Sequence, residues 1–96
     1  MVSVMTVQCL AIDASLTATG VCLPNGETFV IKYPKLRGPE RLCAIREKIL
    51  DRMGDTTLVV IEGYSFGSKG QALFQIGELG GVIRVALYDE GIPFVV

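Results

Sequence analysis

The chain has 96 residues, half of them hydrophobic and 20% of them charged, and its formal net charge is -1. This length and composition are typical of one globular domain with a modest core, and they exclude a disordered chain. The balanced charge gives no sign of a nucleic-acid partner, so any basic surface has to be local. No apolar run is long enough to span a membrane, and the start of the chain lacks the features of a signal peptide.

Three cysteines, Cys9, Cys22 and Cys43, form an odd set without a Cys-x-x-Cys pair, and the chain has no histidine. We therefore expect reduced cysteines that serve as small core residues of a cytoplasmic protein. The missing ligands also exclude a zinc site.

The first third of the chain predicts three strands. Residues 7–12 form an apolar run, residues 20–23 form a second one, and residues 27–33 alternate polar and apolar side chains. Pro24, Asn25 and Gly26 between the second and third runs are a strong turn signal. These patterns together predict an antiparallel meander.

The first apolar run ends on a carboxylate, Asp13, which small and hydroxyl-bearing residues follow up to Gly20. A carboxylate at the edge of an apolar core is costly unless it is paired, hydrogen-bonded or bound to a metal. The alternative is that Asp13 caps the turn by accepting hydrogen bonds from backbone amides.

Four cations, Lys32, Lys35, Arg37 and Arg41, surround the connection that follows the third strand. Such a basic cluster can bind phosphates. The alternative is a solvated loop, because surface charges need no partner.

Residues 39–53 predict a helix that packs on the sheet. Pro39 suits its first position, Glu40 suits its positive N-terminal end, and Gly54 marks its end. Its apolar face consists of Leu42, Ile45, Ile49 and Met53.

Residues 57–61 form a short β-branched run without alternation, which predicts a central strand covered on both faces. This strand also ends on a carboxylate, Glu62. If the first and fourth strands are parallel neighbours, Asp13 and Glu62 emerge at the same edge of the sheet, where sites form in parallel α/β sheets.

The loop of residues 64–70 contains two aromatic residues, Tyr64 and Phe66, together with Ser68 and Lys69. Its aromatic rings could stack on bases while Lys69 reaches a phosphate. The alternative is that both rings fold back onto the core.

Residues 71–90 predict a long helix with Leu73, Ile76, Ile83 and Leu87 on one face. Gly77, Gly80 and Gly81 interrupt this helix, and each glycine weakens it by about 1 kcal/mol relative to alanine. Three glycines so close together indicate close approach of another backbone, either the sheet or a second subunit. Glu78 is expected at the surface or in an interface.

Gly91 ends this helix, and residues 92–96 predict a fifth strand on which the sequence stops. A parallel strand is normally followed by a covering helix. We therefore expect a portion of a larger domain, with Phe94, Val95 and Val96 prone to exposure and self-association.

Three stretches together resemble the RuvC family of Holliday-junction resolvases, and most closely its shorter bacteriophage members. They are IDASLTATGVCL from Ile12, VVIEGYSFG from Val59 and ALFQIGELGGVIRVAL from Ala72. The resemblance implies an α/β, ribonuclease-H-like fold with a mixed five-stranded sheet (β-β-β-α-β-α-β). Residues 1–96 would then be the N-terminal portion of a single nuclease domain.

The same resemblance implies a homodimeric endonuclease that cuts branched DNA, such as a four-way junction. Asp13 and Glu62 match two catalytic, metal-binding carboxylates of the family, which implies Mg²⁺ or Mn²⁺ as the cofactor. The family's other acidic residues lie on a later helix, so the 96 residues alone are expected to be weak or inactive. The DNA-binding residues expected are Tyr64, Phe66, Ser68, Lys69, Gln71, Lys35 and Arg37.

Two other functions remain open. The first is an ATP-binding lobe of an actin-like or sugar-kinase-like protein, which shares the fold and also has an Asp on its first strand. The second is a non-catalytic DNA-binding or dimerisation module whose acidic residues no longer bind metal.

Overall fold

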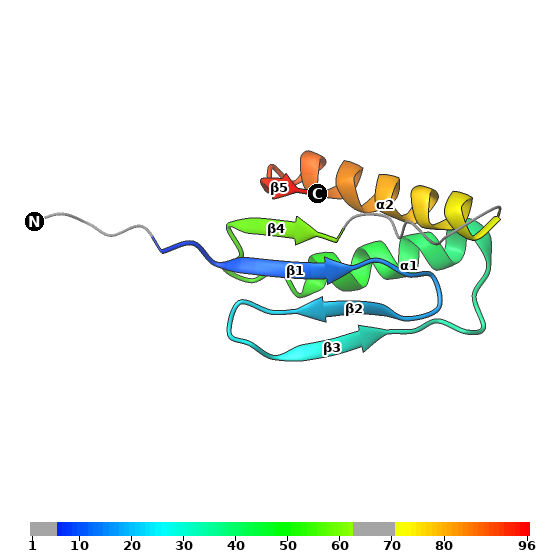
Figure 1. Cartoon of the computed structure of the whole chain (residues 1–96), viewed down its shortest axis with the longest axis horizontal. Helices are drawn as coiled ribbons and strands as arrows, with labels where there is room; N and C mark the ends of the chain where they lie inside the picture. Colours follow the sequence, from blue (N-terminus) through cyan, green and yellow to red (C-terminus); the bar gives the residue numbers. More distant parts are fainter. Residues whose placement is uncertain (1–5, 63–70) are drawn as a thin grey trace, which may run out of the picture.

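A computed structural model describes residues 6–62 and 71–96, without the side chains of residues 71–73, 75 and 76. Five strands and two helices follow one another in the predicted order (Figure 1). They are β1 (Cys9–Asp13), β2 (Thr19–Cys22), β3 (Thr28–Ile31), α1 (Gly38–Asp51), β4 (Leu58–Ile61), α2 (Gln71–Asp89) and β5 (Phe94–Val95). Neither described helix combines the length and the apolar character needed to cross a bilayer.

The strands form one mixed sheet in the order β3-β2-β1-β4-β5. β1, β2 and β3 are antiparallel neighbours, which confirms the predicted meander. β1 and β4 pair in parallel, with Leu10 opposite Val59 and Ile12 opposite Ile61, and β5 continues the parallel part. The parallel pairing that the acidic strand ends require is therefore confirmed.

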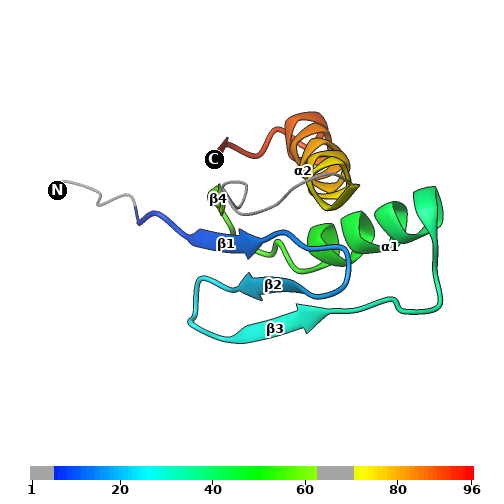
Figure 2. The same cartoon turned by 45° about the vertical axis from the view of Figure 1, so that its right-hand side comes forward.

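Both helices cover the same face of the sheet (Figures 1 and 2). Every second residue of β1 points to them, because side chains alternate across a strand. This one-sided layer holds the core, whose fully buried members include Leu10, Ile12, Ile45, Ile49, Val59, Leu79, Ile83 and Leu87. The other face of the sheet is not covered by any part of the chain that the structure describes.

The two helix ends follow local chemistry. α1 begins one residue before the predicted position, with Pro39 in its first turn, where the missing N–H costs no hydrogen bond. After α2, Gly91 has a left-handed φ of 70°. Its N–H donates to the carbonyl of Tyr88 at 3.0 Å, and the N–H of Ile92 donates to that of Leu87 at 2.9 Å. This pair of bonds is a Schellman motif, for which glycine is the favoured residue.

The prediction that β4 is covered on both faces is wrong for the described part of the chain. Val59 and Ile61 are buried against the helices, whereas Leu58 and Val60 are half-buried on the open face. At the sheet edge, Val95 and Val96 are exposed as expected, but Phe94 packs partly against the core.

The prediction that the cysteines are core residues is also wrong. All three are free thiols, but Cys9 and Cys43 are exposed and Cys22 is half-buried. Cys9 alternates with the buried Leu10 and so lies on the open face of the sheet. Cys43 lies on α1 outside the stripe that contains Ile45 and Ile49.

Candidate functional site

Asp13 and Glu62 lie side by side at the carboxyl ends of two adjacent parallel strands. Asp13 is the last residue of β1, and Glu62 directly follows β4. The N–H of Glu62 donates to the carbonyl of Ile12 at 2.8 Å, which extends the ladder beyond the pairing of Ile12 with Ile61. Each acid directly follows one member of the Ile12–Ile61 pair. The two acids therefore emerge at the same edge of the sheet, as the sequence predicted.

Alternation also places both carboxylates on the open face of the sheet. Asp13 lies on the same face as the exposed Cys9 and Ala11. Glu62 is also exposed and lies on the same face as the half-buried Leu58 and Val60. Both acids border an open hollow of about 500 Å³ over this face. The hollow is mostly apolar and is lined by Ala11, Ile12, Asp13, Gly20, Val21, Cys22, Thr28, Phe29, Val30, Val60 and Glu62.

No described residue pairs with either carboxylate. Neither Asp13 nor Glu62 has a hydrogen-bond or ion-pair partner among the described residues, so Asp13 does not cap the turn there. Gly20 stands opposite Asp13 across the β1–β2 pair and has no side chain to cover it. A methyl group at Gly20 would lie 3.7 Å from the Asp13 Cβ, in ordinary van der Waals contact.

A different residue, Thr19, holds the loop after Asp13. Its fully buried hydroxyl donates to the carbonyl of Ser15 and accepts the N–H of the same residue at 3.2 Å. The hydroxyls of Ser15 and Thr17 add a bond of 3.2 Å. Sequence reasoning did not assign this role to Thr19. The available signal was its position directly before Gly20, where the loop after Asp13 turns back into β2.

We expect Thr19→Val to lower the free energy of unfolding by about 1–3 kcal/mol, because it keeps the side-chain shape but leaves two Ser15 backbone groups without their partner. Thr56→Val is the matched control. Thr56 Oγ1 is buried and, among the described residues, has no hydrogen-bond partner. This control should leave stability unchanged or raise it, since a buried unpaired hydroxyl is unfavourable. Urea unfolding measures both variants, and equal losses would contradict the role of Thr19.

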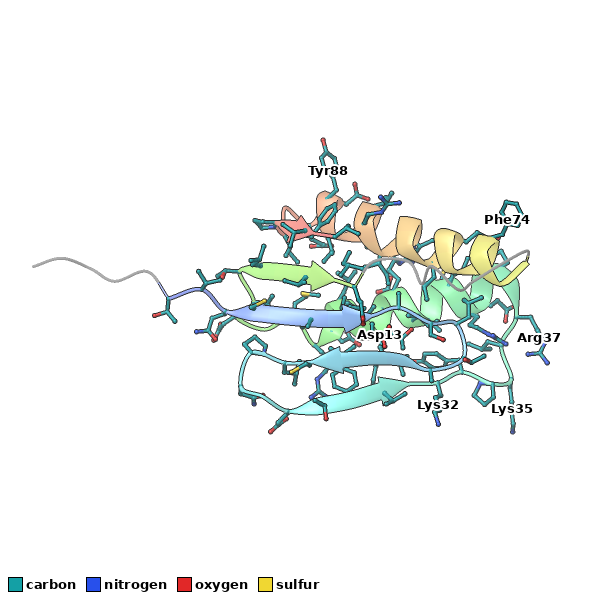
Figure 3. All side chains as sticks on the ribbon, in the orientation of Figure 1. Asp13, Lys32, Lys35, Arg37, Phe74 and Tyr88 are labelled. Atoms are coloured by element: carbon teal, nitrogen blue, oxygen red, sulfur yellow. The ribbon has the colours of Figure 1, made fainter. Side chains whose placement is uncertain are left out.

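The basic cluster lies at the end of the molecule toward which β1 runs (Figure 3). Lys32, Lys35 and Arg37 are exposed and Arg41 is half-buried. Arg37 Nη1 donates to the carbonyls of Pro34 and Leu36 at 3.1 and 3.3 Å, and Arg41 Nε donates to that of Leu36 at 2.9 Å. The ion pair found among the described residues joins Arg46 to Glu47, so none of the four cations of the cluster is in an ion pair there.

A pocket of about 300 Å³ connects this cluster with the loop after Asp13. Its lining includes Leu16 from that loop, Arg37 and Arg41 at the start of α1, and Glu78 of α2. Glu78 is exposed, as predicted, and belongs to this pocket rather than to the acidic pair. Arg41 was not among the DNA-binding residues expected from the sequence, yet it lines the same pocket as Arg37.

The acidic pair, Asp13 and Glu62, offers only two side chains as possible metal ligands among the described residues. Within residues 6–62 and 71–96, no group of three or more Asp, Glu, Cys or His side chains could together hold a metal ion. Four predicted DNA-binding residues, Tyr64, Phe66, Ser68 and Lys69, lie outside the described residues. Gln71 begins α2, but its side chain is not described.

Two solved structures are similar to this chain over most of its length. The structure of T. thermophilus RuvC in complex with a Holliday junction substrate matches with a TM-score of 0.75 at 20% identity, covering 93% of this chain and 62% of that one. A structure of Thermus thermophilus RuvC matches with a TM-score of 0.70 at 21% identity, covering 90% and 60%. The chain has the ribonuclease-H-like fold of RuvC.

The chain spans less than two thirds of the two RuvC chains, 62% and 60% of their lengths. No protein-family model matches it, and no curated protein matches it as a relative. The likeness to RuvC therefore establishes the fold alone. Any inference about activity has to come from Asp13 and Glu62.

Proposed function

We propose that this chain forms part of a metal-dependent endonuclease that binds and cleaves branched DNA. The observation that carries the proposal is the convergence of Asp13 and Glu62 at the carboxyl ends of two adjacent parallel strands, on the open face of the sheet. The fold of RuvC, which has been solved with a Holliday junction substrate, supports a four-way junction as the substrate class.

Asp13 and Glu62 are the residues that would hold Mg²⁺ or Mn²⁺. They fit these ions because both offer carboxylate oxygens, the ligands that hard cations prefer, and because both side chains are exposed and unpaired among the described residues. Such metal ions activate a water molecule and stabilise the leaving oxygen during phosphodiester hydrolysis.

The chain itself supplies the placement of these oxygens. The β1–β4 ladder fixes the two backbones, and Thr19 holds the loop that follows Asp13. Two carboxylates are a small ligand set, and Mg²⁺ bound this way usually needs phosphate oxygens as well. We therefore expect weak metal binding by the free chain, tighter binding with DNA, and weak or no cleavage by these 96 residues alone.

The basic cluster is the proposed contact for the phosphate backbone. Lys35 and Arg37 project from the connection between β3 and α1, and Arg37 and Arg41 share a pocket with the loop after Asp13. Phosphates that follow this surface would approach the acidic pair from the β1–β2 loop. Tyr64, Phe66, Ser68, Lys69 and Gln71 remain predicted contacts with unpaired or distorted bases and their phosphates.

The proposal is tested by binding a labelled four-way junction and a duplex of equal length to the chain, with Mg²⁺ or with a chelator. Preferential junction binding that Mg²⁺ strengthens supports it, and any cleavage has to require the metal. Junction binding that is indifferent to Mg²⁺ would favour the non-catalytic module. ATP binding without junction binding would favour the actin-like or sugar-kinase-like lobe.

Lys35→Ala and Arg37→Ala are each expected to weaken junction binding and to reduce the slope of log affinity against log salt by about one unit, because each removes one phosphate contact. Lys48→Ala is the matched control, since Lys48 is an exposed cation in the last turn of α1. Binding isotherms at four salt concentrations give the slopes. A loss as large in the control would show that the effect is one of net charge alone.

A further inference from the structure

The edge of the sheet that β3 forms is open for pairing with another strand. β3 stands at one end of the order β3-β2-β1-β4-β5, and no described segment lies alongside its outer side (Figure 1). Val30 in this strand is 57% exposed. Native proteins commonly protect such an edge with a proline, a bulge or a very short strand. β3 contains no proline and pairs with β2 without a bulge, whereas the opposite edge, β5, has only two residues.

The register of the β2–β3 hairpin determines which backbone groups face outward. The N–H of Leu23 donates to the carbonyl of Glu27 at 2.7 Å, and the regular pairing of β2 with β3 follows directly. Hydrogen-bonded and non-bonded pairs alternate along an antiparallel ladder. Phe29, two residues after Glu27, therefore bonds to β2, whereas Thr28 and Val30 turn their N–H and C=O groups away from it. An added strand would pair with these outward groups.

Positive charge gathers at one end of this edge. Figure 3 shows Lys32 and Lys35 projecting past β3, and Arg37 follows them in the chain. All three are exposed, and none of them is in an ion pair among the described residues. The exposed Val30 and Lys32 alternate with the buried Ile31, so both lie on the open face of the sheet. A strand added beside β3 would therefore meet an apolar side chain in its middle and cations at one end.

We propose that β3 binds an extended, acidic segment of a partner protein as an additional strand of the sheet, with the carboxylates of that segment beside Lys32 and Lys35. Main-chain hydrogen bonds to Thr28 and Val30 supply the affinity in this mode of recognition. The cations select for acidic side chains through charge complementarity. A peptide backbone suits this edge because it offers donors and acceptors at the spacing of a strand, whereas phosphate groups offer acceptors alone.

A second copy of β3 fits this edge less well than an acidic segment does. When two copies pair antiparallel about Val30, Thr28 of each copy faces Lys32 of the other. Glu27 alternates with Thr28 and therefore belongs to the opposite face of the sheet from Lys32. The second β3 thus offers Lys32 no carboxylate, and the positive charge at both ends stays without a counter-charge.

This proposal does not rest on the proposed nuclease activity, since β2 separates β3 from β1 and its terminal Asp13. The two proposals do share Lys35 and Arg37, which are also the proposed contacts for the phosphate backbone. An acidic segment bound at β3 would therefore compete with DNA for these two cations. The backbone groups of Val30, by contrast, belong to the peptide site alone, and substitutions there separate the two proposals.

Fluorescence anisotropy with labelled synthetic peptides and the whole chain tests the proposal. Two probes alternate valine and threonine and carry a run of glutamates, one at its N-terminal and the other at its C-terminal end. One of them should bind at least about tenfold more tightly than the same peptide with lysines in place of the glutamates, because only carboxylates pair with the cations. Binding of neither glutamate peptide would overturn the proposal and show that Lys32 merely protects the edge. Equal binding of the lysine peptide would overturn it as well.

Val30→Pro should raise the dissociation constant of the glutamate peptide at least about tenfold, because it removes an outward N–H. Proline is tolerated on an edge strand where the N–H faces solvent, so the pairing with β2 is retained. Val30→Thr is the matched control, since it keeps the N–H and the β-branched shape, and it should bind the peptide as the wild type does. Circular dichroism checks the fold of both variants, and both should bind a four-way junction equally. Peptide binding that is unchanged in a folded Val30→Pro chain would contradict strand addition at β3.

A charge reversal tests the site without altering the backbone. Lys32→Glu should weaken the glutamate peptide about fivefold or more and strengthen its lysine counterpart, because the sign of the charge beside the added strand is reversed. Lys48→Glu makes the same change of net charge at an exposed position in the last turn of α1 and should affect neither peptide. Equal effects of the two variants would reject the placement of the acidic side chains. Self-association of the free chain that Val30→Pro abolishes, measured by sedimentation equilibrium, would show that a second copy occupies the edge instead.

Discussion

Asp13→Asn and Glu62→Gln are each expected to reduce Mg²⁺ or Mn²⁺ binding below detection and to abolish metal-dependent cleavage wherever the wild-type chain shows it. Each substitution keeps the shape of the side chain and removes one of two negative charges that would hold the ion. A metal ion supplies several kcal/mol of charge stabilisation in phosphodiester hydrolysis. Because 1.36 kcal/mol is tenfold in rate, its loss corresponds to about 10²–10³-fold or more.

The same two variants should bind a four-way junction as tightly as the wild type or more tightly, since they remove a negative charge that repels phosphate. Paramagnetic broadening of amide signals by Mn²⁺ measures the metal, and a gel-shift titration with a chelator measures the DNA. This separation distinguishes a lost metal ligand from a misfolded domain, which would lose both kinds of binding.

Matched controls for these variants come from acids outside the pair. Asp55→Asn and Glu90→Gln change the net charge equally at exposed positions that do not line the hollow next to Asp13 and Glu62. They should leave metal binding unchanged. Unaltered metal binding and cleavage in Asp13→Asn or in Glu62→Gln would show that the acidic pair is not the metal site.

Leu10→Ala is expected to cause the largest loss of stability among the substitutions considered. Leu10 is fully buried in β1, the central strand of the sheet, which pairs with β2 on one side and β4 on the other. Replacing a buried Leu by Ala costs about 2–5 kcal/mol, because apolar contacts are lost and a cavity remains. Domains of this kind are stable by only about 5–15 kcal/mol, so the melting temperature should fall by about 10 °C or more.

Val7→Ala is the control for this substitution, because Val7 lies shortly before β1 and is exposed. We expect its effect to stay within about 0.5 kcal/mol. Chemical unfolding followed by circular dichroism measures both variants. A cost below about 1 kcal/mol for Leu10→Ala would mean that the layer between the sheet and the helices repacks easily and that β1 is not its centre.

The sequence alone determined the elements and the positions of the acids. Two apolar runs, an alternating run and the turn residues between them identified the meander. Apolar residues that recur along one helix face identified both helices, because this spacing follows from backbone geometry. The places of Asp13 and Glu62 at the ends of apolar strands were also evident. Their convergence required only that the two strands be parallel neighbours, which the pairing of Ile12 with Ile61 confirms.

What the tertiary structure decided was the surroundings of these residues. The sequence did not distinguish Asp13 as a turn cap from Asp13 as a free carboxylate, because that depends on whether another group, here the Thr19 hydroxyl, already holds the loop. It also predicted buried cysteines and a β4 covered on both faces. An apolar side chain shows a preference for burial, but only the placement of α1 and α2 on one side of the sheet determines which face is covered. Both carboxylates therefore lie on the opposite, open face of the sheet.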